Sequence, residues 1–411
     1  MTRNDLVNYF WCFFLKMVAL QEKVSHFTHL QCSQCDKVYS AHEVISYASC
    51  ERCGKNPLCT VYDHLEGITP ADIDSKERSM WRYFSLLPVF DRKNIVSLGE
   101  GFTPILPLER LAKKLDVKHL FLKDESLNPT GSFKARGMSM AISKAKELGI
   151  SRCIVPTAGN AGGAMSAYCA KAGIQALVVM PEHTPEVFKK ECLLYGAELV
   201  LERGLISDCA KRVAQINKDL SYFDISTLKE PYRLEGKKTM GYEIAEQMEW
   251  NLPDVILYPT GGGTGLIGMW KAFREMIEMG WITTRLPRMI AVQAENCQPI
   301  VETWLGNQKD SKSYVGKATF ANGLAVPNPF GEQMILKVLT ESNGKPVSVS
   351  EMEIIANMRE IAQCEGMLVA PEGAALWGAL KKLVAENFIS RDEKILLLNT
   401  GSGYKYLENL A

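Results

Sequence analysis

Neither sign of charge is in excess in this sequence: 47 lysine and arginine residues balance 47 aspartate and glutamate residues, so the formal net charge is zero. Proteins whose main task is to bind nucleic acid usually carry a basic surplus, because their affinity comes from neutralising phosphates. The balance therefore argues against nucleic acid as the principal partner. Histidine is also scarce, and because the spacing of the six histidines demands no metal site, we expect these side chains to be solvated or packed.

The sequence also lacks an apolar run long enough to span a bilayer. Residues 9–20 are apolar and aromatic, but Lys16 interrupts them, and a membrane helix needs about 20 apolar residues. No convincing cleavage site of the secretory type follows them. We expect residues 1–23 to form a packing extension, with Met17 as an alternative start of the chain, and we expect no membrane partner.

Cysteine, in contrast, is frequent: four of the twelve cysteines form two C-x-x-C pairs, Cys32 with Cys35 and Cys50 with Cys53. Pairs at this spacing suit a tetrahedral Cys₄ zinc site, which stabilises a small fold and leaves no open position for chemistry. We therefore predict structural zinc in a zinc-ribbon-like segment, residues 24–66. Redox-active pairs and a docking surface for a partner are the alternatives. The remaining, scattered cysteines favour a reduced, cytoplasmic protein.

From about residue 104 onward, short apolar runs alternate with amphipathic stretches, a pattern typical of β-α-β units and a parallel sheet. The runs predict strands at residues 120–123, 153–156, 176–180, 198–201, 255–258, 289–293 and 394–398. The stretches between them predict helices at residues 161–171, 185–194, 206–218, 236–250 and 266–279, and the charged linker at 71–82 predicts another. We therefore expect an α/β fold of open, twisted, mostly parallel sheets with helices on both faces.

The same alternation suggests how the chain is divided. Residues 136–234 could form a smaller α/β domain inserted into a larger one, which would consist of residues 67–135 and 235–411. A ligand would then bind in the crevice at the carboxyl ends of the strands.

A turn-forming stretch from Asn128 to Gly137 (NPTGSFKARG) places Lys134 where a helix is expected to begin. Lysine forms Schiff bases with carbonyl cofactors, and burial lowers its pKa so that it can act as a base. An exposed lysine in a helix cap is the alternative, and it is the commoner situation.

Two later turns each follow a predicted strand and begin a predicted helix. In residues 157–163 (TAGNAGG), Asn160 and the backbone N–H groups could hold a ring hydroxyl or a carboxylate. A strand-to-helix turn capped by asparagine is the structural alternative. Residues 259–268 (PTGGGTGLIG) are rich in glycine, so the backbone can approach a phosphate, and Thr264 adds a hydroxyl.

A further turn follows the last apolar run, near the C-terminus. There Thr400 or Ser402 could donate a hydrogen bond to a heterocyclic nitrogen, or both could belong to an ordinary terminal turn.

The glycine turn also fits a second class of enzyme. Gly263-x-Gly265-x-x-Gly268 matches the dinucleotide-binding fingerprint, and Glu295 follows the next predicted strand, where a ribose-binding acid would lie. An NAD-dependent dehydrogenase is therefore the alternative from this motif, although it explains neither Lys134 nor Asn160.

Taken in order, the four motifs resemble those of the fold-type-II family of pyridoxal-phosphate (PLP) enzymes, and within it the threonine synthases. The similarity extends from the GEGFTP segment at residues 99–104 to the C-terminus, and includes PYRLEGKKT at 231–239 and PEGAA at 371–375. It implies a lyase of amino-acid biosynthesis that converts O-phospho-L-homoserine and water to L-threonine and phosphate. Members of the family are commonly dimers, so a homodimer is the candidate assembly.

The resemblance also implies roles for individual residues. Lys134 would carry PLP as a Schiff base and shuttle protons, while Arg233 and Thr157 would contact the amino-acid substrate. Asn160 would contact the ring hydroxyl of the cofactor, and Thr400 its pyridine nitrogen. The phosphate of the cofactor would lie in the glycine turn, against Gly261, Gly262, Gly263, Thr264 and Gly265.

At several positions this sequence differs from the threonine synthase pattern. Ala135 stands where an aspartate follows the lysine, Ala158 and Ala161 replace hydroxyl residues, and Thr227 and Leu228 replace an Asn-Ser pair. Because those polar groups help to hold the substrate, a PLP-dependent serine/threonine dehydratase or a β-replacement enzyme acting on another small amino acid remains the alternative.

Overall fold

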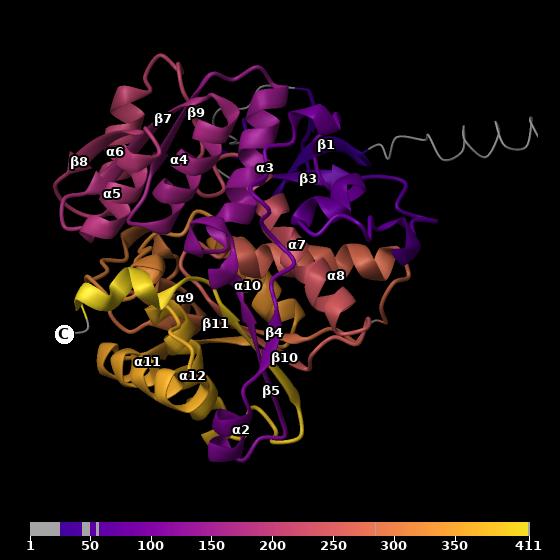
Figure 1. Cartoon of the computed structure of the whole chain (residues 1–411), viewed down its shortest axis with the longest axis vertical. Helices are drawn as coiled ribbons and strands as arrows, with labels where there is room; N and C mark the ends of the chain where they lie inside the picture. Colours follow the sequence, from indigo (N-terminus) through magenta and orange to yellow (C-terminus); the bar gives the residue numbers. More distant parts are fainter. Residues whose placement is uncertain (1–24, 43–49, 55–56, 284, 410–411) are drawn as a thin grey trace, which may run out of the picture.

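The computed structural model describes residues 25–42, 50–54, 57–283 and 285–409, and these residues form three sheets (Figure 1). The smallest is antiparallel, in the order β2 (Val38–Ser40), β1 (Phe27–Cys32), β3 (Leu58–Tyr62). The second is parallel, in the order β8 (Glu198–Glu202), β7 (Gln175–Pro181), β6 (Arg152–Pro156), β9 (Phe223–Asp224). The predicted extension at residues 1–23 lies outside the described residues.

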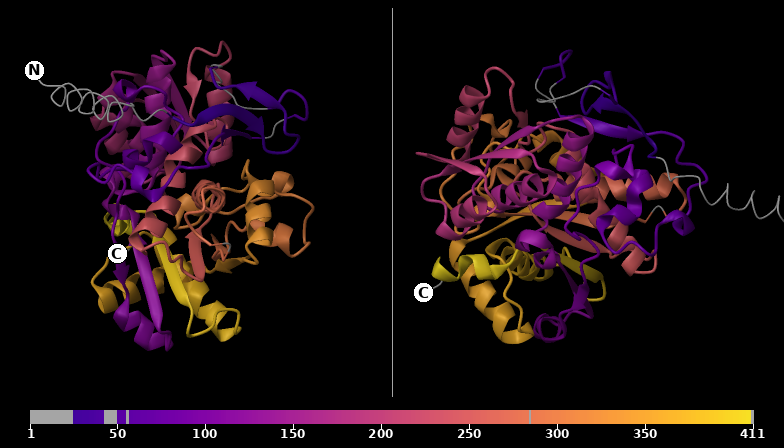
Figure 2. Two further views of the ribbon diagram at one scale, coloured as in Figure 1. Left: turned by 90° about the vertical axis from the view of Figure 1, so that its right-hand side faces the viewer. Right: turned by 45° about the horizontal axis from the view of Figure 1, so that its top comes forward.

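The third sheet has six strands, in the order β12 (Lys345–Val349), β11 (Arg288–Ala294), β10 (Val255–Pro259), β13 (Lys394–Asn399), β5 (His119–Asp124), β4 (Ile105–Pro107). All neighbours in it are parallel except β4, which pairs antiparallel with β5 at one edge. The strands β5 and β13 are far apart in the sequence yet lie side by side, as the left view of Figure 2 shows. The seven predicted strands are confirmed as β5, β6, β7, β8, β10, β11 and β13.

The helices connect these strands, as the alternating pattern predicts. They are α2 (Glu109–Leu115), α3 (Lys134–Glu147), α4 (Asn160–Ala172), α5 (Glu186–Leu194), α6 (Ile206–Ile216), α7 (Tyr232–Gln247), α8 (Thr264–Glu278), α9 (Pro299–Trp304), α10 (Glu332–Glu341), α11 (Glu351–Glu365) and α12 (Pro371–Ala385). The five helices predicted after residue 160 are confirmed as α4 to α8.

The helix predicted in the linker at residues 71–82 is wrong. Two short 3₁₀ helices, η1 (Pro70–Asp72) and η2 (Met80–Leu86), flank an irregular segment instead. Side chains in the linker bond the backbone locally: Asp74 accepts from the N–H of Lys76, and Ser79 accepts from the N–H of Trp81. Short polar side chains of this kind compete with the hydrogen bonds of a continuous helix.

Alternate residues of the central strands enter two different cores, because side chains of a strand point to opposite faces. In β10 and β13, Val255, Leu257 and Ile395 pack with α11 and α12. Their sequence neighbours Ile256 and Leu396 belong to the larger core, which also contains α7 and α8 and one face of the four-stranded sheet. A strand that is buried on both faces needs apolar side chains at successive positions. The central strands could be predicted because such runs are visible in the sequence.

The four-stranded sheet lies within residues 136–234, and every strand of the six-stranded sheet lies outside that range. The domain boundaries themselves stay a prediction. No helix in the described ranges is both long and apolar enough to cross a membrane.

The small antiparallel sheet is attached to α7 and α8 by buried polar contacts. The Tyr62 hydroxyl donates to Glu235 of α7 at 2.7 Å. Lys271 of α8 donates to the Thr60 carbonyl at 2.6 Å and to Glu235 at 2.7 Å. The N-terminal segment is therefore connected directly to the two helices whose first turns carry Arg233 and Thr264.

Candidate active site

One pocket is lined by all but one of the residues predicted to bind the cofactor or the substrate. It is lined by the ends of β6 and β10, the turn after β13, and the first turns of α3, α4, α7, α8 and α12. The predicted residues in its wall are Lys134, Thr157, Asn160, Arg233, Gly261, Gly262, Gly263, Thr264 and Thr400. The carboxyl ends of parallel strands share one edge of a sheet, where ligands of open α/β folds bind. Here the pocket lies between two such edges, that of β6 in the four-stranded sheet and that of β10 and β13 in the six-stranded sheet.

The loop before Lys134 is fixed against the loop that carries Thr400. The Phe133 N–H donates to the Thr400 carbonyl at 3.1 Å, and the Ser402 N–H donates to the Gly131 carbonyl at 2.9 Å. Thr130 and Gly131 have φ values of 60° and 64°, which tighten the turn before α3. The position of Lys134 at the start of the helix is therefore set by backbone contacts between two segments that are far apart in the sequence.

The Lys134 amine is suited to bond formation and proton transfer. Its Nζ lies 4.2 Å from the centroid of the Phe133 ring. Burial, together with the positive charge of Arg233, lowers the pKa of Lys134 to about 7, while Glu372 opposes the shift. At neutral pH the amine and the ammonium are thus both populated, which is what a group that accepts and returns protons needs.

The glycine turn forms a close-packed start to α8. Gly263 has φ 72°, a left-handed conformation that side chains rarely adopt. At Gly261, a Cβ atom would lie 2.3 Å from the Gly323 carbonyl oxygen. Gly265 differs from the prediction, because it does not line the pocket and the Tyr258 hydroxyl fills the space beside it. The turn leaves backbone N–H groups at a helix N-terminus, which is a ready site for an anion.

Arg233 supplies a second group for an anion. Its side chain is 2% exposed, and one Nη donates to the Ile225 carbonyl at 2.5 Å. Its Nε is buried without a hydrogen-bond partner among the described residues, as are the hydroxyls of Thr130 and Ser132. Of these groups, Arg233 lines the pocket. Because buried polar groups are normally satisfied, its unpartnered Nε indicates a position for a polar ligand.

The side-chain orientation of Asn160 is set by a residue that the sequence did not reveal. Lys405 Nζ donates to Asn160 Oδ1 at 3.1 Å, to Glu191 at 2.8 Å and to the Thr130 carbonyl at 2.8 Å. Because the amide oxygen is engaged, Nδ2 of Asn160 is free to face an acceptor such as a ring oxygen. This arrangement fits the predicted contact with a ring hydroxyl.

Glu372 is the other functional candidate that was missed. It accepts from the Gly323 N–H at 2.6 Å and from the Tyr406 hydroxyl at 3.1 Å, and it lines the pocket at the first turn of α12. Burial raises its pKa. The signal was present in the PEGAA segment, where a glutamate in the first turn of the helix is followed only by glycine and apolar residues as far as Leu380.

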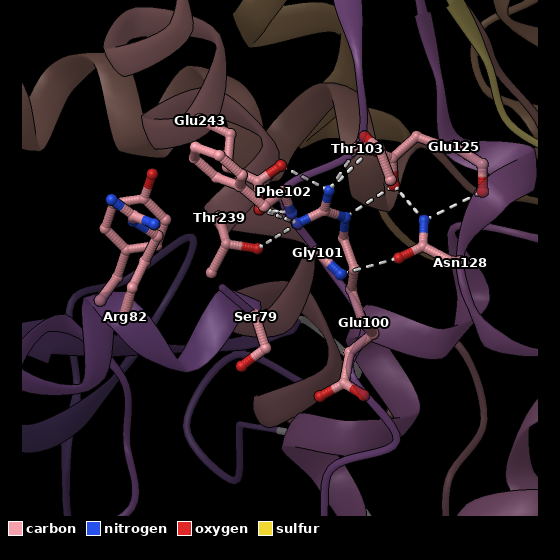
Figure 3. A network of polar contacts seen from close by, with 12 residues as sticks. Ser79, Arg82, Glu100, Gly101, Phe102, Thr103, Glu125, Asn128, Thr239 and Glu243 are labelled. Carbon is pink, nitrogen blue, oxygen red and sulfur yellow. Dashed lines mark hydrogen bonds and ion pairs between the residues drawn. The ribbon is translucent and has the colours of Figure 1, made fainter. Parts of the chain in front are cut away.

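Behind the first turn of α3, a network of buried charges is centred on Arg136. Figure 3 labels its two acidic partners, Glu125 and Glu243. Its guanidinium donates twice to Glu125 of η4 (Glu125–Leu127), at 2.6 and 2.7 Å, and twice to Glu243, at 2.6 and 2.7 Å. Lys123 lies 3.1 Å from Glu243. Although burial alone would raise it, the charges of Arg136 and Lys123 bring the pKa of Glu243 down to about 2. The network ties α3 to α7 and β5.

The positions that differ from the threonine synthase pattern are not all in the pocket. Ala158, Ala161 and Thr227 line it, whereas Ala135 is fully buried in the core and Leu228 is buried with φ 61°. The substitutions therefore remove polar groups mainly near the Asn160 turn.

Glu295, the acid of the dinucleotide alternative, lies away from this pocket. It is not among the residues that line it, and its nearest cation is Lys382 at 3.7 Å.

The four N-terminal cysteines form a separate cluster. Their Sγ atoms lie within 4.8 Å of one another, with Cys32 3.5 Å from Cys53 and Cys35 3.5 Å from Cys50. A tetrahedral zinc ion with bonds of ~2.3 Å requires Sγ atoms about 3.8 Å apart. The cluster therefore has the dimensions of the predicted Cys₄ site.

Comparison with known proteins agrees with this geometry. Threonine synthase from Methanocaldococcus jannaschii is 35% identical over 379 residues, which cover 91% of this chain and 92% of that protein. Threonine synthase from Methanosarcina acetivorans is 36% identical over 375 residues, 91% of each chain.

Solved structures confirm the predicted class of fold. A pyridoxal 5′-phosphate-dependent aspartate racemase superposes with a TM-score of 0.64 at 21% identity, covering 82% of this chain and 96% of that one. Threonine deaminase isoform 2 from Solanum lycopersicum superposes with a TM-score of 0.62 at 20% identity, covering 75% and 82%. Residues 96–401 match the family model described as "Pyridoxal-phosphate dependent enzyme". The chain therefore belongs to the family of pyridoxal-phosphate dependent enzymes.

Proposed function

We propose that this protein is a threonine synthase, which converts O-phospho-L-homoserine and water to L-threonine and phosphate. The observation that carries the proposal is the pocket itself, which is lined by one amine of lowered pKa, Lys134, and by two candidate anion-binding elements, Arg233 and the glycine turn. Similarity to threonine synthases over 91% of the chain supports it.

The residues of the pocket fit PLP. The turn from Gly261 to Thr264 would hold its phosphate, Nδ2 of Asn160 would face its ring oxygen, and the Thr400 hydroxyl would face its ring nitrogen. When bound, PLP supplies an electron sink for charge that develops on the carbon atoms of the amino acid. The protein contributes position, because every one of these groups follows a rigid strand or begins a helix.

Lys134 Nζ would accept a proton from Cα of the substrate and then from Cβ. Arg233, with its unpartnered Nε, would hold the substrate phosphate until that group leaves Cγ. A water molecule then supplies the hydroxyl at Cβ, and Lys134 returns protons to the carbon skeleton. Donors fixed near the leaving phosphate stabilise the charge that builds up on it.

The proposal is tested by mixing purified, PLP-loaded enzyme with O-phospho-L-homoserine and measuring both products. We expect phosphate and threonine in equal amounts, and neither from the Lys134→Ala variant. A yellow enzyme that releases neither product would contradict the threonine synthase assignment but would still support PLP as the cofactor.

A serine/threonine dehydratase is the second candidate, favoured by the absence of hydroxyl groups at Ala158 and Ala161 in the wall of the pocket. Such an enzyme would release ammonia and a 2-oxo acid from serine or threonine, which the same preparation can be assayed for. The family assignment leaves the NAD-dependent dehydrogenase without support, because the glycine turn is accounted for by the phosphate of PLP. A homodimer and a cytoplasmic location stay predictions.

We also propose that the four-cysteine cluster binds structural zinc. Replacement of Cys50 by serine should remove the metal, because a Cys₄ site needs all four thiolates to close. We expect equimolar zinc in the wild type by elemental analysis and a large loss in the variant. Cys364→Ser, on α11 and outside the cluster, should keep its zinc; equal zinc contents in all three proteins would refute the site.

A further inference from the structure

Lys237, on α7, is a buried lysine whose Nζ has one hydrogen-bond partner among the described residues. It is 1% exposed, and its Nζ donates to Thr264 Oγ1 at 2.6 Å. Nζ also lies 5.1 Å from the centroid of the Phe133 ring. It forms no ion pair with a carboxylate in the part of the chain that the structure describes.

Three other buried lysines differ from Lys237, because each has a carboxylate within ion-pairing distance. Lys123 lies 3.1 Å from Glu243, Lys144 lies 2.7 Å from Glu147, and Lys238 lies 2.7 Å from Glu235. A buried ammonium without a counter-charge is costly. Burial and the charges of Arg233 and Lys134 accordingly lower the pKa of Lys237 well below its ordinary value, although the charge of Glu230 opposes the shift. An anion placed beside Nζ would reverse that shift.

Space for this side chain is provided by a glycine in α3. A Cβ atom at Gly137 would lie 3.0 Å from Lys237 Cε and 3.1 Å from the Arg233 carbonyl oxygen. Glycine within a helix is less favourable than alanine. Here it lets Lys237 pass between α3 and α7 and reach the first residue of α8.

We propose that Lys237 is a cationic ligand of the cofactor phosphate, a phosphate monoester dianion bound at the glycine turn. The inference rests on the proposed placement of PLP. The contact with Thr264 brings the ammonium to the N-terminus of α8, next to Gly263. Arg233, one turn earlier on α7, is left for the phosphate of the substrate, so that successive turns of one helix serve two different phosphates. Backbone N–H groups alone neutralise little of a dianion, whereas an ammonium supplies a full charge.

The test compares two ligands that differ only in the phosphate. Apoenzyme affinities for PLP and for pyridoxal, which carries the same aldehyde but no phosphate, are measured by fluorescence quenching. We expect Lys237→Met to raise the Kd for PLP roughly 10- to 100-fold, the loss of one hydrogen bond to a charged group. The Kd for pyridoxal should stay within twofold of wild type. Lys237→Arg should recover part of the affinity, and Lys309→Met, at an exposed position, should change neither constant.

Two outcomes would overturn the proposal. Equal weakening of both ligands would mean that Lys237 acts through Lys134 or through the fold, which thermal unfolding of the apo variants would show. An unchanged Kd for PLP with a raised KM for O-phospho-L-homoserine would assign Lys237 to the substrate phosphate instead. Because the binding measurement uses no substrate, its result is independent of whether the enzyme forms threonine.

Discussion

Replacing Lys134 with alanine is expected to lower the rate of threonine formation by roughly 10⁴-fold, the upper end of what one positioned acid–base group contributes. The variant would lose the amine that holds the cofactor and moves both protons. No other lysine lines the described pocket, so no second amine there could replace it. Steady-state assays of product release measure the loss of activity. The absorption spectrum after dialysis against buffer measures the loss of bound cofactor. Lys146→Ala, at the exposed end of the same helix, should behave like wild type.

The pH dependence of cofactor capture gives an independent check on Lys134. Only the unprotonated amine attacks an aldehyde, so the capture rate of wild-type apoenzyme should rise through a pH of about 7 and level off above it. The positive charge of Arg233 contributes to this low pKa, so Arg233→Met should move the midpoint to higher pH. A midpoint near that of an ordinary lysine in the wild type would show that the amine is not buried as described.

Replacing Arg136 with methionine is expected to cost about 3–5 kcal/mol in the free energy of unfolding, as for other buried ion pairs that lose one partner. Glu125 and Glu243 would remain in the core, with Lys123 as the one cation paired with them among the described residues. Denaturant unfolding followed by tryptophan fluorescence measures the change. Adding Glu125→Gln to the variant should restore part of the stability, because Lys123 lies 3.1 Å from Glu243 but 4.0 Å from Glu125, which leaves Glu125 with the weaker ion pair.

An exposed pair serves as the control for this prediction. Arg285, which is 83% exposed, pairs with Asp254 at 2.5 Å, and Arg285→Met should cost no more than ~1 kcal/mol. If the two arginine variants lose similar stability, the network around Arg136 does not hold α3, α7 and β5 together.

Structure could be predicted from the sequence where a local pattern of residue types is enough to determine the local fold. Strands such as β10 and β13 are buried on both faces, so their apolar runs could be read directly, and the glycine turn was visible because close backbone approach excludes side chains. The linker prediction failed because its Asp and Ser side chains bond the backbone locally. The spacing of apolar residues alone does not reveal that side chains compete with the helix for hydrogen bonds to the backbone.

The parts of the site that could not be predicted depend on contacts between distant segments. Lys405 reaches Asn160 and Glu191 across more than two hundred residues of sequence, and Lys237 reaches Thr264 through a gap that Gly137 leaves open. In the sequence both are ordinary lysines of a C-terminal turn and of a helix. Only their burial and their partners set them apart from the many lysines on the surface.

The strand order has a consequence for how the chain folds while it is being synthesised. The strands β6 to β9 follow one another without interruption, so the four-stranded sheet can form as soon as its own residues have left the ribosome. The strand β5 pairs with β4 and β13, and about 270 residues separate its end from β13, which at ~5–20 residues per second takes roughly 15 to 50 seconds to produce. During that interval Lys134 and the apolar residues of β5 lack most of their partners. We therefore expect this early segment, rather than the later and self-contained sheet, to be the part of the nascent chain that most needs protection from aggregation.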